Sequence, residues 1–163
     1  MPVPATNKPP ATNEPPAANT PAASFPRRDA AGRVRSLAEL MAASAGGTVV
    51  GLAALALIEG VLALIGLSSF GSASGWLAAI LPGLLFFDDL RAWRGHGTRF
   101  LVGAVGLGLA LVVGLLAAGA VRSLPAMVSG FIGALVAALV YAPVWFLGIR
   151  WLTPADQTPE DER

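Results

Sequence analysis

The sequence predicts an all-α integral membrane protein, a four-transmembrane-helix bundle that follows a disordered, proline-rich N-terminal tail. Of its 163 residues, 55% are hydrophobic and only 13% are charged, whereas about 25% of the residues of a soluble domain carry charge. The charges gather before residue 40, at 88–99 and after residue 149. Between them lie apolar runs of about 20 residues, which is the length that crosses roughly 30 Å of hydrocarbon.

Residues 1–28 are expected to form the tail. The hexapeptides PATNKP, PATNEP and PAANTP follow one another from Pro4 to Pro21. Proline removes a backbone donor and pushes the preceding residue out of the α region, so this stretch suits an extended spacer. A ligand for a proline-binding partner is the alternative. Residues 151–163 are expected to form an acidic, polar C-terminal tail.

Residues 29–45 are predicted to form a basic helix on the membrane surface. Arg33 and Arg35 would contact anionic headgroups, and apolar residues recur behind them at helical spacing. Ser36 and Glu39 fit a capping box at the start of this helix. The alternative is that this stretch is an N-terminal extension of the first span.

The membrane domain, residues 47–150, is expected to contain four spans, at about 47–67, 73–90, 100–120 and 127–148. The second has the weakest signal, because its dense apolar part is short and Pro82 interrupts it. It suits either a kinked span or a re-entrant segment. Four spans place ten of the eleven Lys and Arg residues on one side, which the positive-inside rule makes the cytoplasmic side. Arg122 alone lies opposite.

This charge pattern predicts that both termini are cytoplasmic. Ten arginines against one lysine, with abundant alanine and glycine, are typical of GC-rich bacterial genomes, so we expect a bacterial cytoplasmic membrane. Arg91, Arg94 and Arg99, which lie between the second and third spans, are expected to fix topology and to contact anionic lipid headgroups.

Small side chains recur every four residues along the predicted spans. In lipid, close approach of helix backbones supplies the packing contacts that the hydrophobic effect supplies in water. The expected packing residues are Gly106, Ala110, Gly114, Ala118, Gly130, Gly133, Ala134 and Ala137. They suit packing within one bundle, or docking of a protein partner or a second copy. Trp76, Trp93, Trp145 and Trp151 lie near span ends, where aromatic residues usually anchor helices at the interface.

Catalytic motifs are absent from the sequence. There is no cysteine and one histidine, His96, so thiolate sites, histidine-based zinc sites and serine-hydrolase triads are excluded. Asp88, Asp89 and His96 could hold a divalent ion or a lipid headgroup, which leaves an enzyme acting on headgroups as an alternative. Topology and lipid contact are the preferred interpretation, and no cofactor or metal is expected. The net charge of +1 indicates no nucleic-acid partner.

Glu59 is the one carboxylate inside a predicted span. The span 47–67 is centred near residue 57, so Glu59 would lie about 3 Å from the membrane midplane. Charged residues at this depth are functional candidates by default. We expect Glu59 to be protonated at neutral pH and to bond to backbone or water, or to pair with another chain.

Two functions follow from these features. The first is a non-enzymatic accessory or scaffold subunit of a bacterial membrane assembly, in which the small-residue faces and the arginines are contact surfaces. The alternative is a small proton- or cation-coupled transporter, or a channel-like protein, that uses Glu59 as its ion site.

Overall fold

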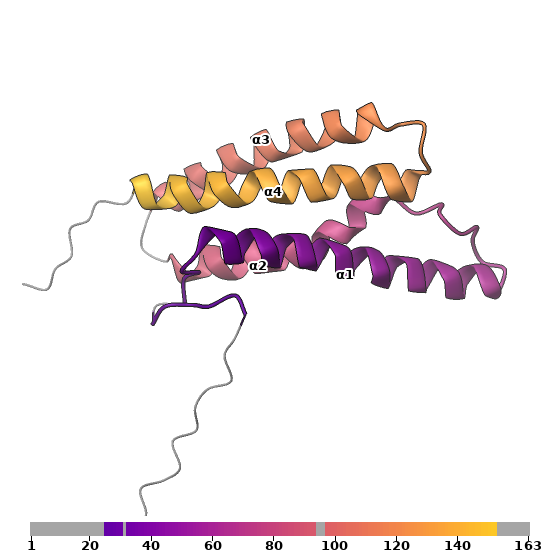
Figure 1. Cartoon of the computed structure of the whole chain (residues 1–163), viewed down its shortest axis with the longest axis horizontal. Coiled ribbons are helices and arrows are strands. Elements are labelled where there is room, and N and C mark those ends of the chain that lie inside the picture. The colour runs from indigo at the N-terminus through magenta and orange to yellow at the C-terminus, as the bar shows by residue number, and fades with distance from the viewer. Residues whose placement is uncertain (1–24, 31, 94–96, 153–163) are drawn as a thin grey trace, which may run out of the picture.

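A computed structural model describes residues 25–30, 32–93 and 97–152, and in these residues the fold is all-helical (Figure 1). Its four α-helices and one 3₁₀ helix are, in chain order, α1 (Leu37–Leu64), η1 (Gly75–Ala79), α2 (Ile80–Ala92), α3 (Thr98–Ala120) and α4 (Ala126–Leu152). Three of them, α1, α3 and α4, are long and apolar enough to cross a membrane. These helices confirm the predicted all-α class and agree with a membrane protein.

Parts of the predicted tails lie outside the described residues, as do Arg94 and His96. Residues 25–28, which the sequence assigns to the N-terminal tail, belong to a segment before α1, residues 25–30 and 32–36, which we call the hook. One antiparallel bridge, between Arg28 and Val34, closes this hook. At the other terminus α4 continues to Leu152, so it includes the first two residues of the predicted C-terminal tail.

The first helix is longer than the predicted span. It runs without a break from Leu37 to Leu64, so residues 37–45 extend the span, as the alternative interpretation had it. The expected capping box does not form, because the Ser36 side chain makes no capping hydrogen bond. Glu39 instead accepts a hydrogen bond from the backbone nitrogen of Arg27, at 2.8 Å.

A glycine C-cap ends α1 three residues before the predicted boundary. Gly66 adopts a φ of 76°, in the left-handed region that favours glycine. Its amide donates to Ala63 O at 3.1 Å, and the amide of Leu67 donates to Leu62 O at 2.9 Å. These two bonds form a Schellman motif, which satisfies carbonyls that the helix end would otherwise leave unpaired.

The second predicted span, 73–90, consists of two elements. Residues Gly75–Ala79 form η1 and Ile80–Ala92 form α2, which has 13 residues and is too short to cross a bilayer alone. We expected Pro82 to kink a long helix, but it does not. It lies in the first turn of α2, where a helix needs no amide donor.

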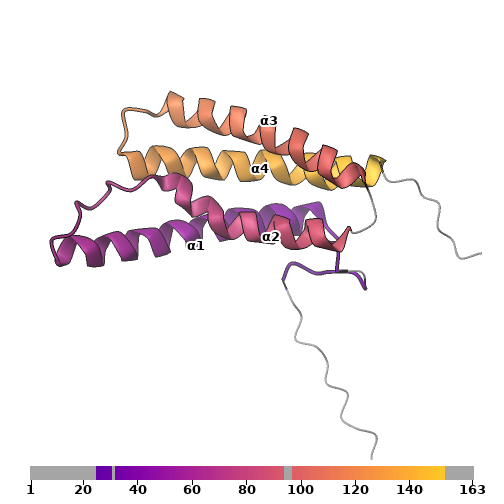
Figure 2. The same cartoon turned by 180° about the vertical axis from the view of Figure 1, so that it is seen from behind.

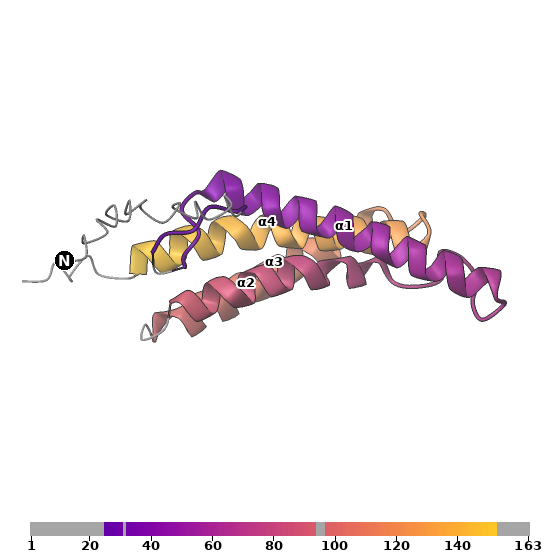
Figure 3. The same ribbon diagram turned by 90° about the horizontal axis from the view of Figure 1, so that it is seen from below.

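Helix α4 is the centre of the bundle and packs against α3, η1 and α1, whereas α2 packs mainly on α1. The start of α1, the end of α2, the start of α3 and the end of α4 lie at one end of the molecule, which we call the arginine end (Figures 1 and 2). At the opposite end α1 projects past the other helices (Figure 3).

Small residues form the contact between α3 and α4. The predicted packing residues Gly106, Ala110 and Gly114 are buried on α3, and Gly130, Gly133, Ala134 and Ala137 are buried on α4. Ala118 is half-buried. A Cβ atom on Gly114 would lie 2.7 Å from the backbone oxygen of Gly133. The two backbones therefore approach as closely as glycine permits.

Candidate functional site

Glu59 lies far from the middle of its helix. Because α1 begins at Leu37 and ends at Leu64, Glu59 is about 13 Å along the axis from the helix midpoint, at 1.5 Å per residue. The expected distance of about 3 Å refers instead to the membrane midplane and to a shorter span, 47–67. The side chain is nevertheless buried, with 3% of its surface exposed.

The Glu59 carboxylate binds the loop that follows its own helix. One oxygen accepts a hydrogen bond from the backbone nitrogen of Gly71 at 2.7 Å. The other accepts from the Ser72 hydroxyl, at 3.2 Å, and from the backbone nitrogen of Ala73. The Glu59 side chain thus accepts three hydrogen bonds, two of them from backbone amides. The expected backbone partners are therefore present, and the expected protonation of Glu59 stays a prediction.

Asp89 is the second buried acid, with 2% of its surface exposed. One of its oxygens accepts a hydrogen bond from Trp145 Nε1 at 2.6 Å, and the other accepts from the backbone nitrogen of Val34 at 3.0 Å. The carbonyl oxygen of Val34 in turn accepts a bond from the Arg150 guanidinium. Asp89 thus joins α2, α4 and the N-terminal hook at the arginine end.

The two adjacent aspartates have different environments, since Asp88 is exposed. His96 lies outside the described residues, and in the described part of the chain no three His, Cys, Asp or Glu residues gather as a metal site would require. Because His96 lies outside the described residues, a site formed by Asp88, Asp89 and His96 stays a prediction; within the described residues Asp89 accepts its hydrogen bonds from protein donors.

Aromatic and cationic side chains pack around Asp89. The guanidinium carbon of Arg33 lies 4.8 Å from the centre of the Trp93 ring, and that of Arg150 lies 3.5 Å from the centre of Phe146. We predicted that Trp93 and Trp145 anchor helices at the membrane interface. Both are instead buried within the protein, so this prediction is wrong for them. Trp151 is exposed, as an anchor would be. Arg35 is also exposed, as a residue that contacts headgroups would be.

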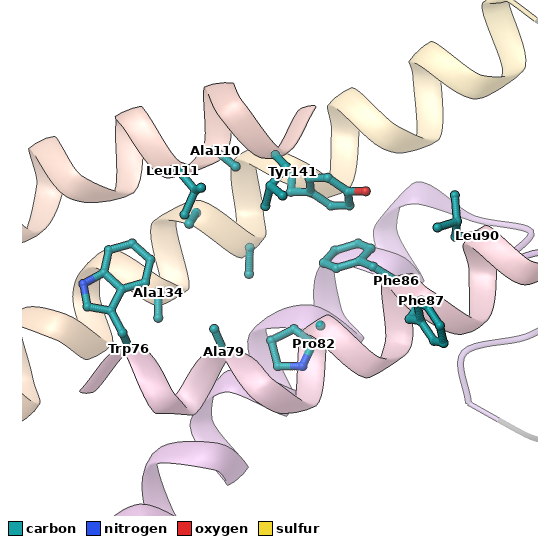
Figure 4. A pocket seen from close by; sticks show the side chains of 14 residues that line it. Trp76, Ala79, Pro82, Phe86, Phe87, Leu90, Ala110, Leu111, Ala134 and Tyr141 are labelled. Carbon is teal, nitrogen blue, oxygen red and sulfur yellow. The ribbon is translucent and has the colours of Figure 1, made fainter. Parts of the chain in front are cut away.

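A lateral groove of about 320 Å³ lies between α2 and α3, and α4 forms its floor (Figure 4). Its walls include Pro82, Phe86 and Leu90 on α2, with Leu107 and Leu111 on α3. Small residues of α4 line the floor, Trp76 stands at one end, and Tyr141 lies beside Phe86. The edge of one ring in the Phe86–Tyr141 pair meets the face of the other, at 4.5 Å between centroids.

Sequence reasoning missed this groove. It assigned the small residues of the spans to helix contacts, whereas Ala134, Ala137 and Ala138 also line an open space. The available signal was the shortness of the apolar part of the second span, because a short α2 leaves α3 without a close neighbour on that side.

Comparison with protein-family models, curated proteins and solved structures finds no match to this chain. The possible chemistry therefore follows from the described contacts. Both buried acids accept hydrogen bonds from groups of the same chain, and neither lines the groove. What these residues offer to another molecule is an apolar groove, exposed helix faces and the arginine end.

Proposed function

We propose that this protein is a non-enzymatic scaffold subunit of a bacterial membrane assembly, and that it crosses the cytoplasmic membrane four times with both termini in the cytoplasm. In this proposal the exposed apolar faces of α1 and α3 contact a neighbouring membrane protein. The bundle itself holds these faces in place and presents its N-terminal segment at the arginine end.

The dimensions of η1 and α2 support four crossings. Placed end to end, the five residues of η1 and the 13 residues of α2 have a combined length of about 30 Å, taken from the rise per residue of 3₁₀ and α-helices. That is about the thickness of the hydrocarbon core. Four crossings also agree with the positive-inside rule, because Arg33, Arg91, Arg99 and Arg150 belong to segments that meet at the arginine end.

The observation that carries the scaffold proposal is the use of both buried acids as structural acceptors. A proton or cation carrier needs a carboxylate that its ion can reach and leave. Glu59 instead holds the loop between α1 and η1 through three donors, and Asp89 holds the hook and α4. Neither acid lines the groove between α2 and α3.

The first test measures ion flux. Purified protein is reconstituted into liposomes, and proton and cation fluxes are compared among wild type, Glu59→Gln and protein-free vesicles. We expect equal fluxes, because the Glu59 carboxylate is a structural acceptor. Amide hydrogen exchange at Gly71 and Ala73 is the folding control, since the glutamine oxygen can still accept one of their bonds. A wild-type flux that Glu59→Gln abolishes without loss of this protection would contradict the proposal and favour the transporter.

The second test identifies neighbours in native membranes. Photoreactive residues are introduced at Leu57 on α1 and Leu116 on α3, which are 70% and 69% exposed. If the protein is a scaffold, we expect at least one of these positions to crosslink to one discrete protein or to a second copy of this chain. Crosslinks to lipid alone from both positions would overturn it.

A further inference from the structure

The groove between α2 and α3 has the shape of a site for a single extended chain. It follows η1 and α2 from Trp76 to Leu90, which is about 20 Å at helical rise. The groove holds about 320 Å³. The volume lies at the lower end of the range for small-molecule sites. Its size therefore suits a hydrocarbon chain.

The lining is apolar along almost its full length. Of the residues that form it, Tyr141 carries the only hydroxyl, and none carries a charge. The floor is made of alanines, which leave room above α4, and Gly83 adds an open position in the α2 wall, where a Cβ atom would meet nothing within 4 Å. An occupant must therefore be apolar where it lies within the groove.

Two arginines stand at the end of the groove that contains Phe87 and Leu90. The guanidinium carbon of Arg91 lies 4.6 Å from the centre of the Phe87 ring. Arg99 Nη1 lies 3.5 Å from the carbonyl oxygen of Leu90, and both of these neighbours line the groove. The two cations thus come from α2 and α3, the helices that form the two walls.

Neither arginine forms an ion pair within the described residues. The Nε atom of Arg99 is also buried without a hydrogen-bond partner in that part of the chain. A buried donor without a partner is costly, and guanidinium groups bind phosphate through charge-assisted hydrogen bonds. These two side chains therefore favour an anionic group at the mouth of an apolar groove.

We propose that the groove binds one acyl chain of an anionic phospholipid, whose phosphate is held between Arg91 and Arg99. This goes beyond the scaffold proposal, which does not depend on a bound lipid. Basic pockets between membrane helices commonly bind anionic headgroups on the cytoplasmic side, and the arginine end is the cytoplasmic end in the proposed topology.

Native mass spectrometry of the full chain tests the headgroup. Protein in detergent micelles is titrated with phosphatidylglycerol or with phosphatidylcholine that has identical acyl chains. We expect one tightly bound phosphatidylglycerol, at least about tenfold preferred, because each arginine near a charged lipid contributes about a fivefold factor. Arg91→Gln with Arg99→Gln should abolish the preference. The charge-matched control, Arg35→Gln with Arg122→Gln, should keep it, since both control residues are exposed and lie outside the groove.

A second pair of variants tests the chain site independently. Gly83→Leu fills the groove, whereas Gly108→Leu places the same side chain in open space on α3, outside the lining. We expect Gly83→Leu to reduce binding of both lipids about tenfold or more, and Gly108→Leu to leave binding unchanged. The proposal fails if Gly83→Leu retains the lipid, if the double arginine variant keeps its preference, or if the controls lose lipid equally.

Discussion

Replacing Asp89 with alanine is expected to lower the free energy of unfolding by about 3 kcal/mol, because two donors then lose their acceptor. Trp145 Nε1 and the backbone nitrogen of Val34 both bond to this carboxylate, at 2.6 and 3.0 Å. Both bonds are buried, so water cannot replace the lost oxygens without entering the packed end of the bundle. The hook before α1 should also detach from α4, since Val34 is held there through Asp89 and Arg150.

Asp88→Ala is the matched control for Asp89→Ala. It removes the same side chain from the neighbouring position, but Asp88 is exposed, and surface substitutions usually change stability by less than about 0.5 kcal/mol. Unfolding in mixed detergent micelles, followed by circular dichroism, measures both variants. Equal stabilities for the two variants would show that Asp89 does not hold the hook and α4 together.

Replacing Gly75 with alanine is expected to destabilise the bundle by about 3 kcal/mol, because η1 meets α4 backbone to backbone. A Cβ atom at Gly75 would overlap the backbone oxygen of Met127 and the backbone nitrogen of Phe131. On the facing helix, a Cβ atom at Gly130 would lie 2.8 Å from the nitrogen of Gly75. Backbone atoms cannot turn away as a flexible side chain can, so the two elements must separate.

Gly83→Ala is the control for Gly75→Ala. Gly83 lies within α2, and a Cβ atom there meets nothing within 4 Å. Alanine should raise stability by up to about 1 kcal/mol, because glycine weakens a helix interior. We therefore expect the same unfolding measurement to give changes in stability of opposite sign for two Gly→Ala substitutions eight positions apart. A loss of stability in Gly83→Ala as large as in Gly75→Ala would contradict the packing described for η1.

Apolar length and turn residues were sufficient to predict α3 and α4. The expected spans 100–120 and 127–148 differ from Thr98–Ala120 and Ala126–Leu152 by four residues or fewer at each end, because continuous apolar runs specify helices locally. The start of α1 was not predictable in this way. Residues 37–46 are compatible with either a separate surface helix or a longer span, and only packing against the rest of the bundle distinguishes these.

The roles of the two acids required tertiary information. The expected partners of Glu59 were backbone, water or another chain, and its actual partners are Gly71, Ser72 and Ala73 in the loop beyond the helix. Asp89 bonds to residues 55 and 56 positions away in sequence, and nothing in the pair Asp88–Asp89 shows which aspartate faces inward. Such partners depend on how distant parts of the chain are brought together in the tertiary fold, which the local sequence pattern does not specify.

Cysteine accessibility tests the central claim, a bundle of four crossings with its arginine end in the cytoplasm. The native chain contains no cysteine, so single substitutions report one position each. We expect an impermeant thiol reagent to label Ser69→Cys and Ser123→Cys in intact cells, and to label Arg35→Cys and Gly97→Cys only after permeabilisation. Labelling of Gly97→Cys from outside, with Arg35→Cys still protected, would show that η1 and α2 do not cross the membrane and would contradict the account.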